Sequence, residues 1–236
     1  MSTHTASERL PASPFPTAQQ REKDRDAKRH ALLLAAARMF NARGFHAASL
    51  DDVAASVGVT KPTIYHYLGN KERVLIECMR IGLIRLQEAA DDANRTEGSG
   101  MEKLRAFLIG YAQVNMSEFG QCVIRTGDEL LSAEGLDELR ALKRPIDDAM
   151  RSFLTEGMAD RSIVKGDVKL IAFGLAGALN WPGRWYKPSG ALSPQAIAEQ
   201  LTEFLVSGLA PRAISSEVET PNGSEIAENQ KSGPHF

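Results

Sequence analysis

Residues 50–67 read LDDVAASVGVTKPTIYHY, and this stretch decides the fold. Two helices that cross steeply through a three-residue turn need a small residue where they touch, and Ala54 provides it. The turn needs a residue that accepts a positive φ angle, and Gly58 provides it. The apolar residues expected to fill the wedge between the helices are Val53, Val57, Val59, Ile64 and Tyr67. The pattern predicts a helix-turn-helix rather than a plain helical hairpin.

Capping residues fix where these helices begin. Ser49 stands three residues before Asp52 and predicts an N-cap for a helix that ends near Val57. Thr60 is expected to cap the second helix, in which Pro62 is tolerated because it falls in the first turn. A first helix over residues 26–43 precedes the pair, and a long one capped by Asn70 follows over residues 71–93.

The rest of the chain also has helical period, without a convincing strand. We expect an all-α fold of about nine helices, with a three-helix DNA-binding domain followed by a larger helical ligand-binding and dimerisation domain. The further helices are predicted at residues 101–118, 123–132, 136–158 with a kink at Pro145, 167–181 and 194–208. The predicted divisions are a disordered tail over 1–22, the helix-turn-helix domain over 23–70, the larger domain over 71–210 and a disordered tail over 211–236.

The second helix of the motif would enter the major groove of DNA with its early residues facing base edges. Lys61 can donate to guanine, Thr63 offers a hydroxyl and a methyl group, and Pro62 can contact a thymine methyl group. Lys71 would bind a phosphate beside the free N–H groups of the next helix. The full set of predicted DNA-binding residues is Ser49, Thr60, Lys61, Pro62, Thr63, Tyr65, His66, Tyr67 and Lys71.

The distribution of charge agrees with DNA binding at one end of the chain. The net charge is −2, but residues 21–75 contain ten Lys and Arg against six Asp and Glu, a net charge of +4, so the remainder carries −6. This acidic remainder argues against an architectural protein, which would be basic throughout. A basic arm for backbone or minor-groove contact is expected at Arg21, Lys23, Arg25, Lys28 and Arg29.

Composition and motifs exclude several other classes of protein. The longest apolar stretch, residues 170–179, is half of the roughly 20 residues that a membrane span needs, so no membrane partner is expected, and the location is predicted as cytoplasmic. No Gly-rich phosphate loop or metal-spaced cluster occurs, and the five histidines lack a paired nucleophile. We therefore predict no enzyme activity, no metal and no cofactor.

The stretch LLLAAARMFNARGFHAASLDDVAASVGVTKPTIYHYLGNKERVL resembles the amino-terminal domain of the TetR family of one-component bacterial regulators. The match covers about fifty residues from Ala27 to Glu77 and is most specific in GVTKPTIYHYLGNKE. Leu68 departs from the Phe of many members. The resemblance implies a homodimer whose three small helices bind a double-stranded operator. It also implies a cavity whose ligand moves the two reader helices out of register with the grooves.

Small residues in the helix predicted over 167–181, together with the apolar helix over 194–208, predict the dimer interface, and Ala176 and Gly177 are placed in it. The segment NWPGRWYKPSGALSP, residues 180–194, resembles family members that respond to acyl-CoA or steroid-degradation CoA thioesters. The inducer is therefore predicted as a hydrophobic small molecule, with an acyl-CoA as one form. An aromatic clasp against the dimer partner is the alternative for this segment. The predicted ligand-binding residues are Tyr111, Asn115, Arg125, Phe153, Trp181, Arg184 and Trp185.

Two alternatives to a ligand-responsive repressor use the same fold. One is a helical protein that binds a small molecule without acting on DNA. The other is a redox sensor that uses the thiols of Cys78 and Cys122, the two cysteines of the chain.

Overall fold

Helix α1 (Ala18–Arg43) begins eight residues before its predicted start at Asp26. The computed structural model describes residues 17–211, and the predictions for residues 1–16 and 212–236 lie outside this range. Thr17 caps α1 by accepting a hydrogen bond from the N–H of Gln20 at 3.2 Å. Residues 18–28 are all exposed, so no apolar periodicity signals this part of the helix. The predicted disordered tail over 1–22 is therefore wrong for residues 18–22.

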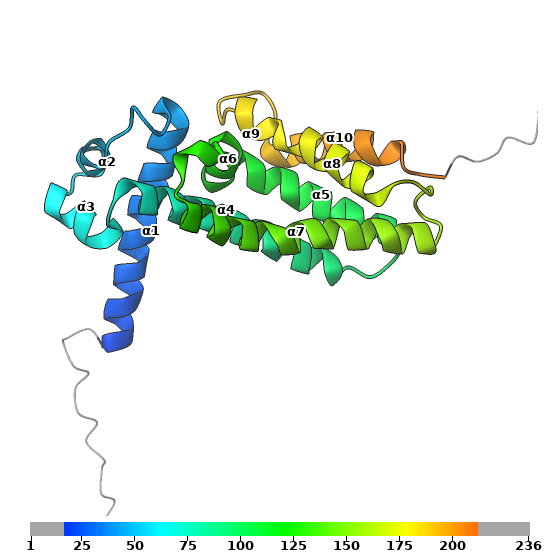
Figure 1. The fold of residues 1–236 in the computed structure, drawn as a ribbon, viewed down its shortest axis with the longest axis horizontal. Coiled ribbons are helices and arrows are strands. Elements are labelled where there is room, and N and C mark those ends of the chain that lie inside the picture. The colour runs from blue at the N-terminus through cyan, green and yellow to red at the C-terminus, as the bar shows by residue number, and fades with distance from the viewer. Residues whose placement is uncertain (1–16, 212–236) are drawn as a thin grey trace, which may run out of the picture.

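Helices α2 (Leu50–Ser56) and α3 (Lys61–Leu68) form the predicted helix-turn-helix against α1 (Figure 1). The hydroxyl of Ser49 accepts a hydrogen bond from the N–H of Asp52 at 3.0 Å, which confirms the predicted cap. Ala54 and Ile64 are buried between the helices, and Gly58 has a φ angle of +69° in the turn. Val57 is 40% exposed, so its predicted place in the wedge is wrong. It follows the last residue of α2, where the chain turns and directs the side chain to solvent.

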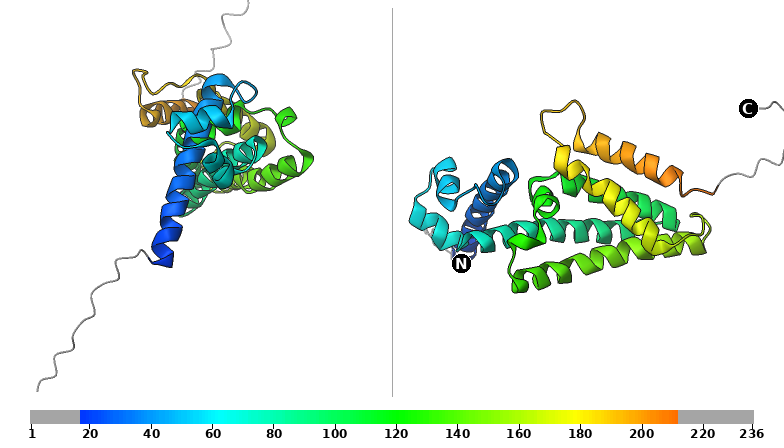
Figure 2. Two further views of the ribbon diagram at one scale, coloured as in Figure 1. Left: turned by 90° about the vertical axis from the view of Figure 1, so that its left-hand side faces the viewer. Right: turned by 45° about the horizontal axis from the view of Figure 1, so that its top comes forward.

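The larger domain contains seven α-helices and a 3₁₀ turn within the described residues. These elements are α4 (Lys71–Asn94), α5 (Gly100–Met116), α6 (Glu118–Arg125), η1 (Asp128–Leu130), α7 (Ala133–Ala159), α8 (Val168–Asn180), α9 (Pro182–Trp185) and α10 (Pro194–Ser207). Helices α4, α5 and α7 pack on one another, and α8 and α10 cover α5 (Figure 2). Residues 17–211 thus contain nine helices of seven or more residues and the short α9, which confirms the predicted all-α class.

Two predictions for this domain differ from the structure. Helix α6 occupies residues 118–125 instead of 123–132, because the hydroxyl of Ser117 caps it by accepting a hydrogen bond from Gly120 at 3.2 Å. Residues 182–193, which lie between two predicted helices and were expected to be a loop, contain the short helix α9. Helix α7 contains Pro145 within its length, as predicted, and the kink expected there stays a prediction.

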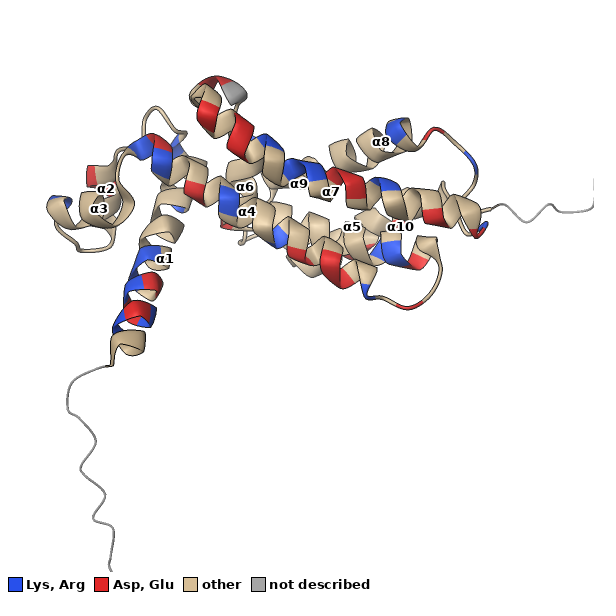
Figure 3. Ribbon diagram, turned by 60° about the horizontal axis from the view of Figure 1, so that its bottom comes forward, with Lys and Arg blue, Asp and Glu red and all other residues tan. Residues whose placement is uncertain are grey.

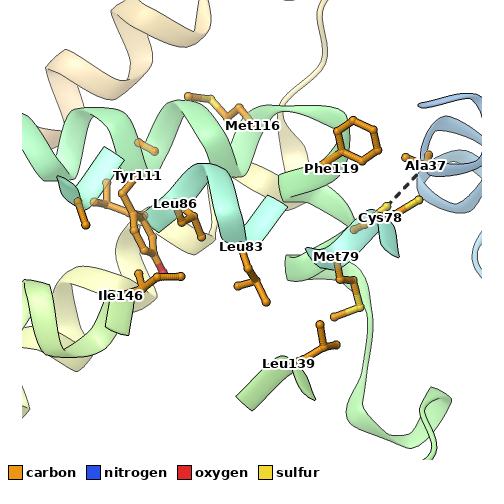
Figure 4. Close-up of a cluster of buried hydrophobic side chains, with 14 of the residues drawn as sticks. Ala37, Cys78, Met79, Leu83, Leu86, Tyr111, Met116, Phe119, Leu139 and Ile146 are labelled. Carbon is orange, nitrogen blue, oxygen red and sulfur yellow. Dashed lines mark hydrogen bonds between the residues drawn. The ribbon is translucent and has the colours of Figure 1, made fainter. Parts of the chain in front are cut away.

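Helix α4 joins the two domains, because its side chains enter both cores. It packs against α1 and α3 of the DNA-binding domain and against α5, α6 and α7 of the larger domain. Figure 4 shows Cys78 of α4 beside Phe119 of α6 and Met79 beside Leu139 of α7, with Leu83 and Leu86 further along α4. Burying such side chains stabilises the fold by roughly 1.5–3 kcal/mol each. The position of the DNA-binding domain is therefore tied to the core of the larger domain.

The corner between α5 and α6 is too tight for any side chain at Gly120. A Cβ atom there would lie 1.9 Å from the carbonyl oxygen of Val114. Ser117 lies between the two helices, and its hydroxyl also donates to the carbonyl of Val114 at 2.6 Å. The direction in which α6 leaves α5 thus depends on Gly120.

We predict that Gly120→Ala lowers the free energy of unfolding by about 1–3 kcal/mol, because backbone has to shift to admit the methyl group. Urea denaturation monitored by circular dichroism measures this change. Gly208→Ala is the control, since its Cβ would meet nothing closer than 3.7 Å. Equal stability of the Gly120→Ala variant and the parent chain would contradict this account of the corner.

Candidate DNA-binding surface and ligand cavity

Helix α3 has one buried face and one exposed face, as a reader helix requires. Ile64 and Leu68 are buried against α1, α2 and α4, and Thr63 and Tyr67 are half-buried. The side chains that face solvent are those of Lys61, Pro62, Tyr65 and His66. Thr60 stands at the N-cap position, but its hydroxyl bonds to the hydroxyl of Thr63 at 2.8 Å and makes no capping hydrogen bond. The exposed face of α3 thus comprises four of the nine residues predicted to contact DNA.

Lys61 forms an ion pair with Asp51 of α2, which the sequence did not indicate. The distance from Nζ to Oδ2 is 2.6 Å, and both side chains are exposed. The hydrogen bond to Asp51 and its negative charge raise the pKa of Lys61. The ammonium group is therefore held beside the turn, and contact with a base requires it to exchange this carboxylate for the base.

Lys71 lies at the start of α4 and is held by two neighbours. Its Nζ atom donates to the carbonyl of His46 at 3.3 Å and lies 4.4 Å from the centroid of the Phe45 ring. Asn70 caps the helix by accepting a hydrogen bond from the N–H of Arg73 at 2.8 Å. A fixed cation beside a helix N-terminus favours a phosphate.

The predicted basic arm is the amino-terminal part of α1 (Figure 3). It is helical and exposed, and acidic residues alternate with the basic ones along it. Arg29 pairs with Glu77 at 3.4 Å and so binds α1 to α4. The arm carries less net charge than its basic residues alone would give it.

A cavity of about 460 Å³ lies among helices α4 to α9 of the larger domain. Four of the seven predicted ligand-binding residues line it, namely Tyr111, Asn115, Trp181 and Arg184. Met150, a further cavity candidate from the sequence, also lines it. The sequence did not indicate the remaining lining residues, which are Leu83, Leu86, Val123, Ile124, Lys143, Ile146, Asp147, Ala176, Gly177 and Asn180. Apolar residues with helical spacing can line a cavity or fill a core, and only the tertiary structure distinguishes the two.

The other three predicted ligand-binding residues lie outside the cavity. Phe153 is buried in the core, where its ring packs against Phe107 at a centroid distance of 5.7 Å. Trp185 is exposed at the end of α9. The guanidinium of Arg125 binds three main-chain carbonyls and so has no place among the lining residues.

The cavity combines apolar walls with a polar inner group and charged residues at its rim. The hydroxyl of Tyr111 and the amide of Asn115 donate to Oδ1 of Asn180, at 2.9 and 3.0 Å. Burial raises the pKa of Tyr111, so this phenol is neutral at ordinary pH.

The exposed residues of the rim include Lys143 of α7 and Arg184 of α9. The nearby Asp147 pairs with Arg151 at 2.8 Å. Such a site suits a ligand with an apolar part and an anionic part.

Helices α8 and α10 expose an apolar face. Leu170 and Phe173 of α8 are 72% and 56% exposed, Trp181 directly after α8 is 63% exposed, and Phe204 of α10 is 76% exposed. Gly177 lies on the exposed side, where a Cβ atom would meet nothing within 4 Å. Ala176 is half-buried and lines the cavity together with Gly177, and the place of both residues in a dimer interface stays a prediction. Large exposed apolar groups in one area mark an interaction surface.

The two thiols are buried and reduced. Cys78 donates to the carbonyl of Leu33 at 3.4 Å, and Cys122 lies 3.5 Å from Oδ1 of Asn41. A hydrogen bond with Cys122 and burial raise the pKa of Cys78 well above its usual value. Because the thiolate is the reactive form, this environment disfavours oxidation and so weighs against the redox-sensor alternative.

Comparison with known proteins agrees with both domains. Residues 32–78 match the family model of bacterial regulatory proteins of the tetR family, and residues 97–209 match the tetracyclin repressor-like C-terminal domain. The chain is similar to the HTH-type transcriptional repressor KstR2 of Mycolicibacterium smegmatis, with 28% identity over 78% of this chain and 91% of that protein. It is also similar to the HTH-type transcriptional activator FasR of the same organism, with 23% identity over 79% of this chain and 84% of that protein.

Among solved structures, the chain is similar to AibR in complex with isovaleryl coenzyme A and operator DNA. The TM-score is 0.68 and the identity 25%, over 79% of this chain and 100% of AibR. The protein therefore belongs to the TetR family of bacterial transcriptional regulators. None of the helices described over residues 17–211 has the length and apolar character that a bilayer span requires.

Proposed function

We propose that this regulator is a homodimeric repressor that binds a palindromic operator and is released by a hydrophobic CoA thioester. The observation that supports this most is the cavity, which has apolar walls and has Lys143 and Arg184 at its rim. The similar protein AibR was solved in complex with isovaleryl coenzyme A, which supports a ligand of the same class. An uncharged hydrophobic ligand is the second candidate, because it would fit the same apolar walls.

Of the two relatives with similar sequences, KstR2 is named a transcriptional repressor and FasR a transcriptional activator. Repression is proposed here because the identity to KstR2 is the higher of the two. The DNA contacts proposed for α3 are the same for either sign of regulation.

The exposed faces of α8 and α10 support the homodimer. One reader helix per chain recognises one half-site, and a twofold axis places two such helices on a palindrome. Leu170, Phe173 and Phe204 would be removed from water when these faces meet a second copy. The absence of a side chain at Gly177 permits close approach of the two α8 helices.

We predict that Lys61→Ala and Lys71→Ala weaken DNA binding in different ways. Lys61→Ala is expected to cost about 1–3 kcal/mol on the best duplex and to relax discrimination at one base pair. Lys71→Ala removes a phosphate contact, so it should weaken binding to all duplexes alike. It should also lower the slope of log affinity against log salt concentration by about one. Gel shift at matched salt with selected and scrambled duplexes measures both effects.

The remote, exposed Lys165 supplies the control for this series, since Lys165→Ala removes the same charge from the far end of the larger domain. Equal affinity of the parent chain for selected and scrambled duplexes would refute sequence-specific binding.

We predict that Gly177→Arg gives a folded monomer with poor operator affinity. In the dimer two unpaired guanidinium groups would be buried at the contact between the α8 helices, while in the monomer the side chain extends into solvent. Analytical ultracentrifugation gives the oligomeric state, and Ala141→Arg on the exposed side of α7 is the control. An undisturbed Gly177→Arg dimer would place the interface elsewhere.

We predict that long-chain acyl-CoA at micromolar concentration releases the selected duplex, whereas the free acid and CoA alone do not. The thioester joins an apolar chain to phosphates, and Arg184 can bind a phosphate with the forked geometry of its guanidinium. Arg184→Ala should weaken release about tenfold or more, because a hydrogen bond to a charged group contributes about 1.5–3 kcal/mol. If no CoA ester releases the duplex, the uncharged hydrophobic ligand becomes the better proposal.

A further inference from the structure

Arg125, the last residue of α6, links two elements that belong to different functional regions. Its Nη1 atom donates to the carbonyl of Asn41 in the last turn of α1, at 2.9 Å. Its Nε atom donates to the carbonyl of Gly183 and its Nη2 atom to the carbonyl of Arg184, both in α9 and both at 3.0 Å. One rigid group thus joins the helix that supports the reader motif to a wall of the cavity.

Helix α9 cannot move independently of the neighbouring cavity wall. A Cβ atom at Gly183 would lie 2.8 Å from the carbonyl oxygen of Asn115, so the backbone of α9 is in close contact with α5. The side chain of Arg184 donates to the carbonyl of Ile124 at 3.2 Å, which attaches α9 to α6. Asn115, Ile124 and Arg184 all line the cavity, so a ligand there contacts the elements that hold Arg125 in place.

The other end of the link leads to the DNA-binding surface. Asn41 lies two residues before the end of α1, and α1 packs against both α2 and α3. The amide of Asn41 also donates to the carbonyl of Glu118 at 2.8 Å, so the last turn of α1 follows α6. A displacement of this turn changes the orientation of the reader helix relative to the larger domain.

We propose that Arg125 is the positioning residue that couples occupancy of the cavity to the orientation of the DNA-binding domain. The proposal rests on the proposed function, since it assumes that a ligand in the cavity changes affinity for DNA. Arginine suits this role because its planar guanidinium presents donors in fixed directions to separate acceptors. The ammonium group of lysine is a single point and cannot reach all three carbonyls in this geometry.

The first test measures coupling in full-length Arg125→Met. Affinity for a duplex selected from a random pool is measured with and without saturating palmitoyl-CoA, by fluorescence anisotropy. Allosteric coupling of this kind is typically about 5–150-fold. We expect the ratio of the two affinities to fall below about threefold in Arg125→Met. The affinity for the duplex alone and the affinity for palmitoyl-CoA alone should each stay within about threefold of the parent value. A ratio that stays at its parental value would overturn the proposal.

Arg38→Met is the matched control. Arg38 also joins α1 to α6, through Glu118 at 2.9 Å, but it has no hydrogen bond to α9. Its loss should therefore leave most of the coupling in place. Equal loss of coupling in Arg38→Met and Arg125→Met would show that the α1–α6 junction acts without α9, and would overturn the assignment. Arg125→Lys should behave like Arg125→Met, since charge alone is not sufficient.

A ligand-independent arm separates this proposal from the proposed function. Ala176 lines the cavity, so Ala176→Trp places a bulky group inside it. If palmitoyl-CoA fails to release the duplex, the proposed ligand is wrong, but Ala176→Trp still tests the coupling.

We expect Ala176→Trp to change the affinity for the duplex about fivefold or more in the parent chain. In the Arg125→Met background the same substitution should change this affinity less than twofold. An equal effect in both backgrounds, or no effect in either, would overturn it. Circular dichroism confirms that each variant is folded.

Discussion

Helix α4 has to be buried in two cores at once, and the arrangement of the other helices follows from this constraint. Val74 and Leu75 are fully buried where α4 meets the DNA-binding domain, and Leu83 and Leu86 are buried in the larger domain. Exposing any of these side chains costs roughly 1.5–3 kcal/mol, a large share of the net stability of a domain. The two domains therefore share one continuous core, through which a displacement of helices in the larger domain would also displace the reader helix α3.

Polar contacts at the junction of α1, α6 and α9 determine the direction of such a shift. The apolar core resists separation of the helices, but it is not directional and permits small sliding movements. Hydrogen bonds from Arg125 and Asn41 to main-chain carbonyls are directional and join specific turns. The thiols of Cys78 and Cys122 lie in the same region and contribute packing and weak hydrogen bonds rather than redox chemistry.

The DNA-facing surface and the cavity place their charges in different ways. Lys61 is paired with Asp51 on an exposed surface, where the net contribution of an ion pair is small, at about 0–1 kcal/mol. Exchange of that carboxylate for DNA is therefore easy. At the cavity, Asp147 is paired with Arg151, and the rim cations Lys143 and Arg184 lie beside apolar walls. The exposed ion pair of α3 suits a large polyanion such as DNA, and the cavity suits a small amphiphilic anion.

Local rules were sufficient for the helix-turn-helix, because its caps and turn depend on residues within four positions of one another, such as Ser49 with Asp52 and Gly58 in its turn. The family and the all-α class follow from that stretch. Only the tertiary structure decided that Ala176 and Gly177 line the cavity, since small residues carry too little apolar area to mark a helix face. It alone also gave Arg125 its partners, which lie 58 to 84 residues away, because such contacts exist only once the helices have packed.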